Sequence, residues 1–402
     1  MSELSYLEKL LDGVEVEWVT LGSMADIGTG SSNRQDESEN GIYPFYVRSK
    51  NILKSDTFEF DEVAIVIPGE GGIGDIFHYV EGKYALHQRA YRIRITTNAV
   101  DTKFLYYFMS SSFKQYILTK SVGATAISIR KPMLEGFKVP IPSPDNPEKS
   151  LAIQSEIVRI LDKFTALTAE LTAELTAELN MRKKQYNYYR DQLLSFKEGE
   201  VEWKTLGEVA KIQRGASPRP IVNYLTEQGN GIPWIKIGDT IPGSKYIDKT
   251  LQKITAEGAQ KSRILNPGDF VISNSMSFGR PYILRITGAI HDGWASISNF
   301  GEKLNTDYLY HYLSSKKVKN YWESKINSGS VSNLNADIIK TLPVPLPDKQ
   351  KQERISALLD KFDTLTNSIT EGLPREIELR QKQYEYYRDL LFSFPKPETI
   401  SN

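Results

Sequence analysis

The sequence predicts an α+β protein in which two globular units of mixed strands and helices are separated by two long helices. Three observations support this prediction. Most of the chain occurs twice, the first part of each copy is rich in short β-type runs, and each copy ends in a charged helical stretch. Runs such as "EVAIVIP", "DFVISNS" and "PYILRI", bounded by Gly, Pro and polar residues, are typical of strands in an α+β domain.

The repeat is visible at several points of the chain. "VEWVTLG" at 16–22 returns as "VEWKTLG" at 201–207, an offset of 185. "DTKFLYYFM" at 101–109 is similar to "NTDYLYHYL" at 305–313, an offset of 204. Each aromatic run predicts one helix, at about 101–118 and 305–322. The offset between the two copies thus changes along the globular parts, which match only at scattered positions.

The helical parts repeat in strict register. "RKKQYNYYRDQLLSF" at 182–196 returns as "RQKQYEYYRDLLFSF" at 380–394, with an offset of 198, which "LDKF" at 161–164 shares. The opening "YLEKLLDGVEVEW" is similar to "YYRDQLLSFKEGEVEW" at 188–203. The two ends of the chain therefore complete one repeat, and we expect a closed, pseudo-two-fold arrangement like that of a fused dimer.

The first long helix is predicted from about Ser150 to Lys197, where Gly and Pro are absent and apolar residues recur every three or four positions. Such a helix is a rod of roughly 70 Å. It contains the tetrapeptide Thr-Ala-Glu-Leu three times between 168 and 179. Gly372 and Pro374 predict a kink or a break in the second copy. The two apolar stripes are expected to pack as an antiparallel coiled coil.

Composition excludes several classes of protein. The chain of 402 residues has no Cys, which excludes disulfides and thiolate metal sites, and its four His are dispersed. No apolar run is long enough for a membrane span, and the acidic start is unlike a signal peptide, so we expect a cytoplasmic protein. "PGEGGIG" at 68–74 matches a dinucleotide-binding pattern, but a strand rather than a helix is expected after it. We interpret it as a glycine loop between strands.

Charge indicates a polyanion as partner. Residues 78–140 hold ten basic and three acidic residues, and residues 208–348 hold seventeen basic and twelve acidic ones, within a chain of net charge zero. Polar loops near these bases carry side chains suited to base edges and phosphates. Ordinary surface variation remains an alternative. The candidates for DNA binding are Gln88, Arg89, Arg92, Arg130, Lys131, Asn274, Ser275, Ser277, Arg280 and Asn333.

The chain resembles the specificity subunits of type I restriction-modification enzymes, and within them the IC subfamily. The residues that carry the resemblance are the "VEW.TLG" segments, "VPIP" at 139–142 and "VPLP" at 344–347, both "LDKF…KQY.YYRD..LSF" helices and the Thr-Ala-Glu-Leu run. It implies target-recognition domains at 1–149 and 198–348, a spacer helix at 150–197 and a distal helix at 349–402. Each domain is then expected to read one half of a split, asymmetric double-stranded DNA sequence.

The resemblance also implies partners. Two modification (methyltransferase) subunits are expected to dock on the helices, and restriction (translocase and nuclease) subunits join that complex. S-adenosylmethionine, ATP and magnesium would belong to those partners, and this chain would be non-catalytic, without a cofactor of its own. The candidates for contact with the modification subunits are Tyr186, Tyr188, Tyr189, Arg190, Tyr384, Tyr386, Tyr387 and Arg388.

Two other functions remain open from the sequence: a stand-alone DNA methyltransferase that uses the glycine loop, and a tandem scaffold without a nucleic-acid partner. The repeat run is interpreted as a spacer with Thr168, Leu171, Leu175 and Leu179 along it. Four residues of helix advance about 6 Å and turn about 40°, and this rotation is close to that of one DNA base pair. One repeat is therefore expected to correspond to one unread base pair of the target.

Overall fold

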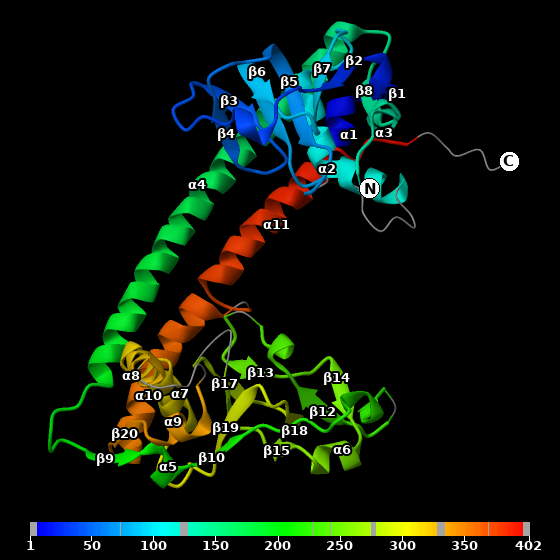
Figure 1. The fold of residues 1–402 in the computed structure, drawn as a ribbon. Coiled ribbons are helices and arrows are strands. Elements are labelled where there is room, and N and C mark those ends of the chain that lie inside the picture. Colours follow the sequence, from blue (N-terminus) through cyan, green and yellow to red (C-terminus); the bar gives the residue numbers. More distant parts are fainter. Residues whose placement is uncertain are drawn as a thin grey trace. The chain divides into compact units, whose positions relative to one another are not determined.

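The computed structural model has two compact units (Figure 1). Unit 1 consists of Met1–Leu171 and Arg380–Asn402, and unit 2 consists of Thr172–Leu379. Both units combine β-sheets with helices, as the sequence predicts. The structure describes residues 6–72, 74–120, 128–227, 229–241, 243–274, 279–327, 334–368 and 370–396. Within these ranges no helix is long and apolar enough to cross a bilayer.

Unit 1 is built on a six-stranded sheet in the order β2-β7-β5-β6-β3-β4. All neighbouring strands are antiparallel except β3 and β6, which are parallel. The aromatic helix α2 (Thr102–Lys120) packs on β5 and β6, and its Phe104 and Phe113 are fully buried with Ile65 of β5. The strands are β2 (Ala25–Thr29), β3 (Tyr43–Tyr46), β4 (Ile52–Ser55), β5 (Phe60–Pro68), β6 (His78–Leu86) and β7 (Ala90–Ile95).

The two ends of the chain meet in the core of unit 1. Leu7 and Leu11 of α1 (Tyr6–Leu11) belong to the same buried cluster as Phe392 and Phe394. The indole Nε1 of Trp18, on β1 (Val16–Thr20), donates to the carbonyl of Pro395 at 2.8 Å. Strand β1 pairs antiparallel with β8 (Lys138–Pro142), which follows the short helix α3 (Lys131–Glu135). Residues from the beginning and from the end of the chain therefore pack in one core.

Unit 2 divides its strands between two five-stranded sheets, ordered β10-β19-β16-β17-β13 and β11-β14-β12-β18-β15, and a β9–β20 ribbon. The strands are β9 (Glu202–Thr205), β10 (Lys211–Arg214), β11 (Leu225–Thr226), β12 (Ile232–Ile235), β13 (Tyr246–Ile247), β14 (Gln252–Ile254), β15 (Arg263–Leu265), β16 (Phe270–Ser273), β17 (Pro281–Leu284), β18 (Gly288–Ile290), β19 (Trp294–Ser298) and β20 (Pro343–Leu346). Short helices α5 (Leu206–Val209), α6 (Ala256–Gln260) and α9 (Ala336–Lys340) connect them.

The aromatic helix of unit 2 differs from the prediction. Where the sequence predicts one helix at 305–322, the structure has α7 (Thr306–Leu313) and α8 (Lys316–Asn327). The interruption lies at two consecutive serines, and the Ser315 hydroxyl accepts the backbone N–H of Val318 at 3.3 Å. Serine side chains compete for backbone hydrogen bonds in this way, which favours a new helix start over continuation of the old helix.

The first long helix is α4 (Pro147–Leu193), close to the predicted range, and its N-terminal part belongs to unit 1 while its C-terminal part belongs to unit 2. The second copy is interrupted as predicted and forms α10 (Lys349–Asn367) and α11 (Leu373–Leu391). Gly372 has a φ of 123°, and an added Cβ would lie 2.4 Å from the carbonyl oxygen of Thr364. Pro374 follows in the first turn of α11, where its missing N–H is tolerated.

Within each unit, α4 lies beside one of the distal helices. In unit 1, Phe164 and Tyr387 have ring centroids 5.7 Å apart, and Thr165 donates to the hydroxyl of Tyr384 at 3.1 Å, which is an antiparallel arrangement with α11. In unit 2, Tyr189 stacks on Phe362 of α10. Between Leu161 and Tyr186, α4 has no fully buried side chain, and the leucines of the repeat are only half-buried.

Two buried glutamines attach the long helices to the aromatic helices. Gln154 of α4 accepts the backbone N–H of Asp101 at 2.8 Å, and Asp101 in turn caps the start of α2 by accepting the N–H of Phe104. Gln352 of α10 accepts the N–H of Asn305 at 2.7 Å, and Asn305 caps α7. Both glutamine amides also donate to backbone carbonyls, so each side chain uses its oxygen and its nitrogen.

Replacing Gln352 by Leu is expected to lower the free energy of unfolding by about 3 kcal/mol, because each buried polar group that loses its hydrogen bond costs about 1–3 kcal/mol. Chemical denaturation of the full chain measures this change. The matched control is Gln192→Leu, an exposed position on α4, for which we expect a change within about 0.5 kcal/mol. Equal effects of the two substitutions would contradict the role given to Gln352.

Candidate nucleic-acid interface

The glycine loop at 68–74 lies between two antiparallel strands, β5 and β6, as predicted. A dinucleotide site needs a helix that opens at the last glycine, so that its N-terminal N–H groups face the pyrophosphate. The segment that follows forms β6 instead. Among the residues that the structure describes, no group of His, Asp and Glu is arranged to hold a metal ion.

The turn between β6 and β7 carries two of the candidates in unit 1. Gln88 is exposed, and its amide nitrogen donates to the side-chain oxygen of Asn33. Arg89 is exposed and forms an ion pair of 3.1 Å with Glu70, which Arg48 also contacts at 3.1 Å. The amide oxygen of Gln88 thus stays available on the surface, near Arg48 and Arg89.

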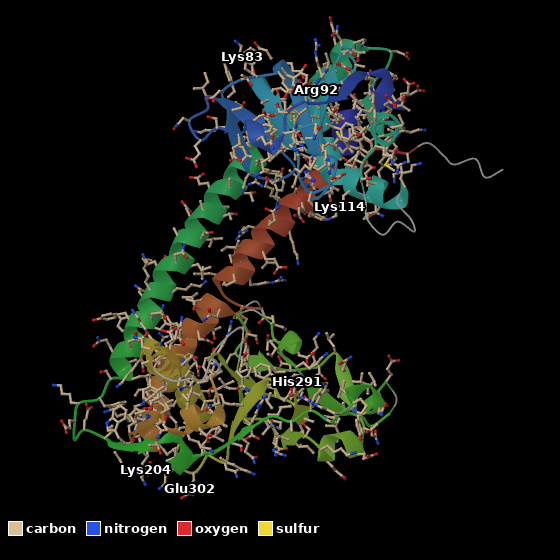
Figure 2. All side chains as sticks on the ribbon, viewed as in Figure 1. Lys83, Arg92, Lys114, Lys204, His291 and Glu302 are labelled. Atoms are coloured by element: carbon tan, nitrogen blue, oxygen red, sulfur yellow. The ribbon has the colours of Figure 1, made fainter. Side chains whose placement is uncertain are left out.

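Arg92 occupies a different environment, on the face of the sheet (Figure 2). Its guanidinium is mostly buried between Asp26, at 2.6 Å, and Glu62, at 3.3 Å. The hydrogen bond from Arg92 lowers the pKa of Asp26 below its usual value. Burial and this pairing do not favour a DNA contact for Arg92, since its Nε and Nη1 are covered although they have no hydrogen-bond partner among the described residues.

Arg130 and Lys131 lie at the start of α3. Arg130 is exposed, and Lys131 is 3.8 Å from Glu135 one turn later. The segment before them pairs with the glycine loop, because Ser128 and Glu70 form a bridge and the N–H of Ile129 donates to Gly69. The structure therefore brings this segment beside the β6–β7 turn, although the two are about 40 residues apart in the sequence.

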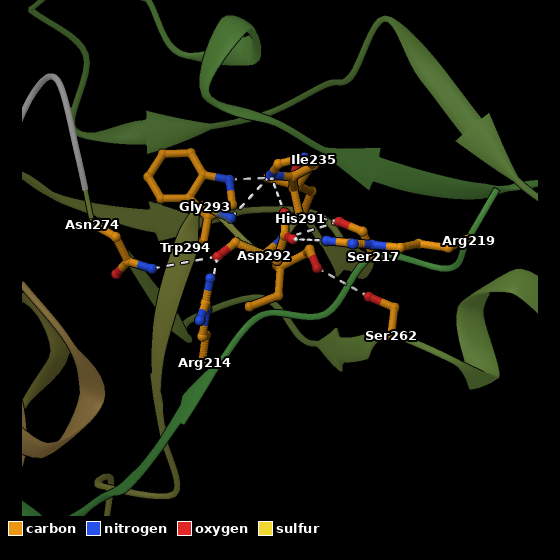
Figure 3. Close-up of polar contacts among 11 residues, drawn as sticks. Arg214, Ser217, Arg219, Ile235, Ser262, Asn274, His291, Asp292, Gly293 and Trp294 are labelled. Atoms are coloured by element: carbon orange, nitrogen blue, oxygen red, sulfur yellow. Dashed lines mark hydrogen bonds and ion pairs between the residues drawn. The ribbon is translucent and has the colours of Figure 1, made fainter. Parts of the chain in front are cut away.

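Unit 2 has a polar cluster around Asp292, in the turn between β18 and β19 (Figure 3). Its carboxylate accepts from the Ser217 hydroxyl at 3.0 Å and pairs with Arg219 at 3.3 Å, and its backbone carbonyl accepts from Arg214 at 3.3 Å. Burial acts to raise the pKa of Asp292, but these donors and His291 outweigh it and hold the pKa below the usual value. Asp292 is therefore ionised and organises two exposed arginines.

Two candidates lie close together in the sequence, at Asn274 after β16 and at Arg280 before β17. Asn274 points toward the Asp292 turn, its backbone N–H donates to Gly293 at 3.1 Å, and its side-chain oxygen is buried without a partner among the described residues (Figure 3). Arg280 lies over the ring of Tyr282 and lines a cavity of about 380 Å³ together with Lys183 and Lys319. Ser275, Ser277 and Asn333 lie outside the described residues.

A buried polar network joins α4, α7 and α10 in unit 2. Asp360 accepts from Lys245 at 2.7 Å and lies 2.8 Å from the imidazole Nε2 of His311, while the hydroxyl of Tyr186 lies 2.8 Å from Nδ1 of the same ring. In unit 1, Asp162 takes the equivalent place and contacts Lys103 and Tyr107, each at 2.7 Å. The repeated "LDKF" segment thus carries one aspartate that attaches each long helix to its globular part.

This network corrects part of the expected partner surface. Tyr186 is buried against His311, and Arg190 is buried with its guanidinium over the Tyr186 ring, so neither side chain is available to a partner. Tyr384 is half-buried through its contact with Thr165, and Arg388 is mostly covered and paired with Asp389. The exposed members of the set are Tyr188, at 62 %, Tyr386, at 64 %, Tyr189 and Tyr387.

The sequence reasoning missed three groups of residues in this region. The aspartates of "LDKF" were seen only as part of a repeat, and the histidines His87 and His291 only as dispersed residues. The loop residues Ser217 and Arg219 were not considered. The signal that identifies the histidines is the offset of 204 between "ALHQ" at 85–88 and "AIHD" at 289–292, which the aromatic helices also show.

These features describe a binding protein built from a repeated module, in which polar turns at the ends of β-sheets accompany long helices with exposed tyrosines. The family model of the type I restriction modification DNA specificity domain matches residues 13–181 and 198–379, one match for each copy. The chain belongs to this family.

Relatives that match along the whole chain have consistent names. The specificity subunit of the type I restriction enzyme EcoR124I/EcoR124II from Escherichia coli is 41 % identical, and the match covers all of both chains. The EcoprrI specificity subunit from Escherichia coli is 36 % identical over 92 % of this chain and 93 % of that protein. A solved structure described as showing complex assembly and conformational transition of the type I R-M system has a TM-score of 0.62, with 18 % identity over 94 % of this chain and 97 % of that chain. It supports the fold.

We expect replacement of His87 by Asn to reduce the acid sensitivity of unit 1. Burial, together with Arg48 and Arg89, lowers the pKa of His87, so its ring is neutral and Nδ1 accepts the N–H of Arg89 at 3.0 Å. Because the unfolded chain takes up this proton first, stability falls as pH decreases below about 6.5.

Asn supplies an acceptor for the same N–H but does not titrate. The measurement is the midpoint of chemical unfolding at pH 7 and pH 5 for both proteins. His78, whose pKa burial also lowers, contributes equally to both. An unchanged difference between the two pH values in the Asn variant would contradict this role for His87.

Proposed function

We propose that this chain is the DNA sequence-specificity subunit of a type I restriction-modification complex. In this proposal each globular unit reads one half of a bipartite, asymmetric target, and the helices set the distance between the halves. The observation that supports it most is the duplication itself. The two units share helix caps, helix attachment and part of the strand pairing, and they differ in the polar residues that their turns expose. That is the expected design for reading two different half-sites.

The reading mechanism is non-catalytic in this proposal. Loops at the sheet ends approach the major groove, where Gln and Asn suit adenine and Arg suits guanine, while other basic side chains bind phosphates. Exposed Gln88, Arg89 and Arg130 in unit 1 lie on neighbouring segments and are suited to this role. In unit 2, Asn274 donates its backbone N–H to Gly293 of the β18–β19 turn, and Arg280 lines the neighbouring cavity, so both are candidates for this role.

The helices supply the docking surface in this proposal. Tyr188, Tyr189, Tyr386 and Tyr387 are large, exposed and apolar on one side, which is typical of residues at the centre of protein interfaces. We propose that they contact two modification subunits, and that restriction subunits join the complex through these. S-adenosylmethionine, ATP and magnesium then belong to the partner subunits. The position of the glycine loop between antiparallel strands does not favour a methyl-donor site here.

A hybrid chain tests the proposal. We expect that replacing residues 198–348 by the corresponding segment of a relative with another target changes one half-site of the methylated sequence and leaves the other half-site unchanged. The measurement is the mapping of methylated adenines in DNA from cells that carry the full system. The parental chain, and a hybrid exchanged at residues 1–149, serve as controls. A hybrid that keeps both parental half-sites would refute the proposal.

The spacer function has its own test. Deletion of one Thr-Ala-Glu-Leu unit from α4 is expected to shorten the unread gap by about one base pair, since four residues rotate the helix by about 40° and one base pair by about 35°. Both half-sites should stay unchanged, because the globular units keep their residues. A matched control replaces one unit by Ala-Ala-Glu-Leu at constant length, which should leave the gap as it was. An unchanged gap after the deletion would exclude a spacer role.

A further inference from the structure

Both units fold the same two segments against each other at the end of a sheet. We call this pair of segments the presentation edge. In unit 1 it consists of the loop at 30–34 and the turn at 87–89, and in unit 2 of the loop at 215–219 and the turn at 291–293. The loops read "GSSNR" and "GASPR" with an offset of 185, and the turns read "HQR" and "HDG" with an offset of 204.

The turns share four hydrogen bonds. The imidazole Nδ1 of His87 accepts the N–H of Arg89 at 3.0 Å, and that of His291 accepts the N–H of Gly293 at 2.9 Å. The backbone N–H of each histidine donates to the carbonyl of the last residue of a neighbouring strand. The backbone carbonyl of each histidine accepts the N–H of the residue three positions later. The carbonyl of residue 89 or 293 then accepts from the segment that follows β5 or β16.

In both units the backbone N–H of the residue after the histidine donates to the shared serine of the loop, to its carbonyl in unit 1 and to its hydroxyl in unit 2. The N–H of Gln88 donates to the Ser32 carbonyl at 2.9 Å, and the N–H of Asp292 contacts the Ser217 hydroxyl at 3.2 Å. Glycine begins both loops because the backbones approach closely. A Cβ on Gly30 would lie 1.9 Å from the Leu86 carbonyl oxygen, and one on Gly215 would lie 2.0 Å from that of His291.

The strands that lead into the presentation edge also pair in the same way in both units. Phe45 pairs with Ala85 in unit 1, and Trp234 pairs with Ala289 in unit 2, in both cases between parallel strands. All four residues are buried. Because the rest of the globular parts differ in strand number and in offset, this agreement identifies the edge as a common framework.

Two positions of the presentation edge are relevant to binding: one carries an exposed arginine in both units, and the other carries a different residue in each unit. Arg34 and Arg219 lie two residues after the shared serines, and their side chains are 85 % and 83 % exposed. Each forms an ion pair with one carboxylate, Arg34 with Glu37 at 3.8 Å and Arg219 with Asp292 at 3.3 Å. The residue after the histidine differs, and is Gln88 in unit 1 and Asp292 in unit 2.

We propose that the presentation edge is the DNA-contacting element of each unit, with Arg34 and Arg219 binding phosphates and the position of Gln88 and Asp292 reading a base. This inference rests on the proposed function and names its residues. A phosphate contact carries no sequence information, so the same arginine serves both half-sites. A base contact must differ between half-sites. Gln offers an acceptor and a donor for adenine, whereas Asp accepts from an exocyclic amine, such as N4 of cytosine.

Basic side chains suited to a polyanionic ligand lie near the edge, beside the carboxylates of Glu37, Glu59 and Glu70 in unit 1. In unit 1, Arg89 belongs to the turn and shares its partner Glu70 with Arg48, and in unit 2, Arg214 donates to the carbonyl of Asp292. Arginines that are already paired with one carboxylate keep further N–H donors for a phosphate, since a guanidinium has five. The edge therefore combines exposed cations with one variable polar side chain at a fixed place.

The test uses the full chain, assembled with the modification subunits, and duplexes that carry the mapped target or a scrambled sequence. Arg219→Ala and Arg34→Ala are each expected to weaken binding of both duplexes by the same factor, roughly tenfold at 0.1 M salt. The slope of log K against log salt should decrease by about 1 in each variant. Arg219→Lys keeps a positive charge and should restore the slope.

Gln88→Ala has a different expected result. It should reduce discrimination at one base pair of one half-site by roughly tenfold and leave binding of the scrambled duplex unchanged. Arg285→Ala is the matched control, because Arg285 is exposed, is paired with Asp248 at 3.5 Å and precedes β18 whereas the turn follows that strand, so its loss should change neither property.

The results of these binding experiments distinguish a failure of the presentation-edge proposal from a failure of the proposed function. If the parental complex discriminates between the duplexes but the Arg34 and Arg219 variants keep its affinity and salt slope, the presentation edge is not the contact element, while the proposed function stands. If the parental complex binds both duplexes equally, the proposed function itself fails. Loss of target binding alone in the arginine variants would assign them to base reading and overturn the division of roles.

Discussion

The attachment of two long helices to two globular parts depends on a pair of buried amides. Gln154 and Gln352 each use both ends of the side chain, and each holds the backbone of the residue that caps an aromatic helix. A buried amide without these partners would be costly, so the long helix has one rotational position at which it satisfies them. Asp162 and Asp360 lie two turns further along and add ion pairs at the same helix face. The direction in which each helix leaves its globular part follows from these contacts.

Much of the fold could be predicted from the sequence, because its strongest signals are local or repeated. The absence of Gly and Pro and the apolar spacing indicated the range of α4 to within a few residues. Gly372 and Pro374 indicated the interruption between α10 and α11. The separation of α7 from α8 was not predicted, since hydrophobic periodicity continues across Ser315, whose side chain accepts a backbone hydrogen bond at the start of α8. The division of unit 2 into two sheets depends on long-range pairing that no short window of sequence contains.

The candidate interface was predictable only in part. Exposed polar residues such as Gln88 and Arg130 could be proposed from residue type, but type alone did not distinguish Arg92, whose two carboxylate partners come from strands far away in the sequence. Residue type alone also could not distinguish the buried Tyr186 from the exposed Tyr188, two positions later on the same helix. His87 and His291 became informative when the structure showed that both rings close the same turn. Comparison of one unit with the other then supplied information that a single domain does not contain.

The interruption between α10 and α11 makes the two copies of the helical repeat differ in continuity. α4 is one helix of 47 residues, whereas the second copy is divided into two helices of 19 residues each. Each added Thr-Ala-Glu-Leu unit extends α4 by about 6 Å, and the second copy has no such repeat. A change of length is therefore confined to one uninterrupted helix, whose hydrogen-bonded backbone carries the added rise and rotation along its axis. The backbone of Gly372, with a φ of 123°, marks the place where the second copy loses that continuity.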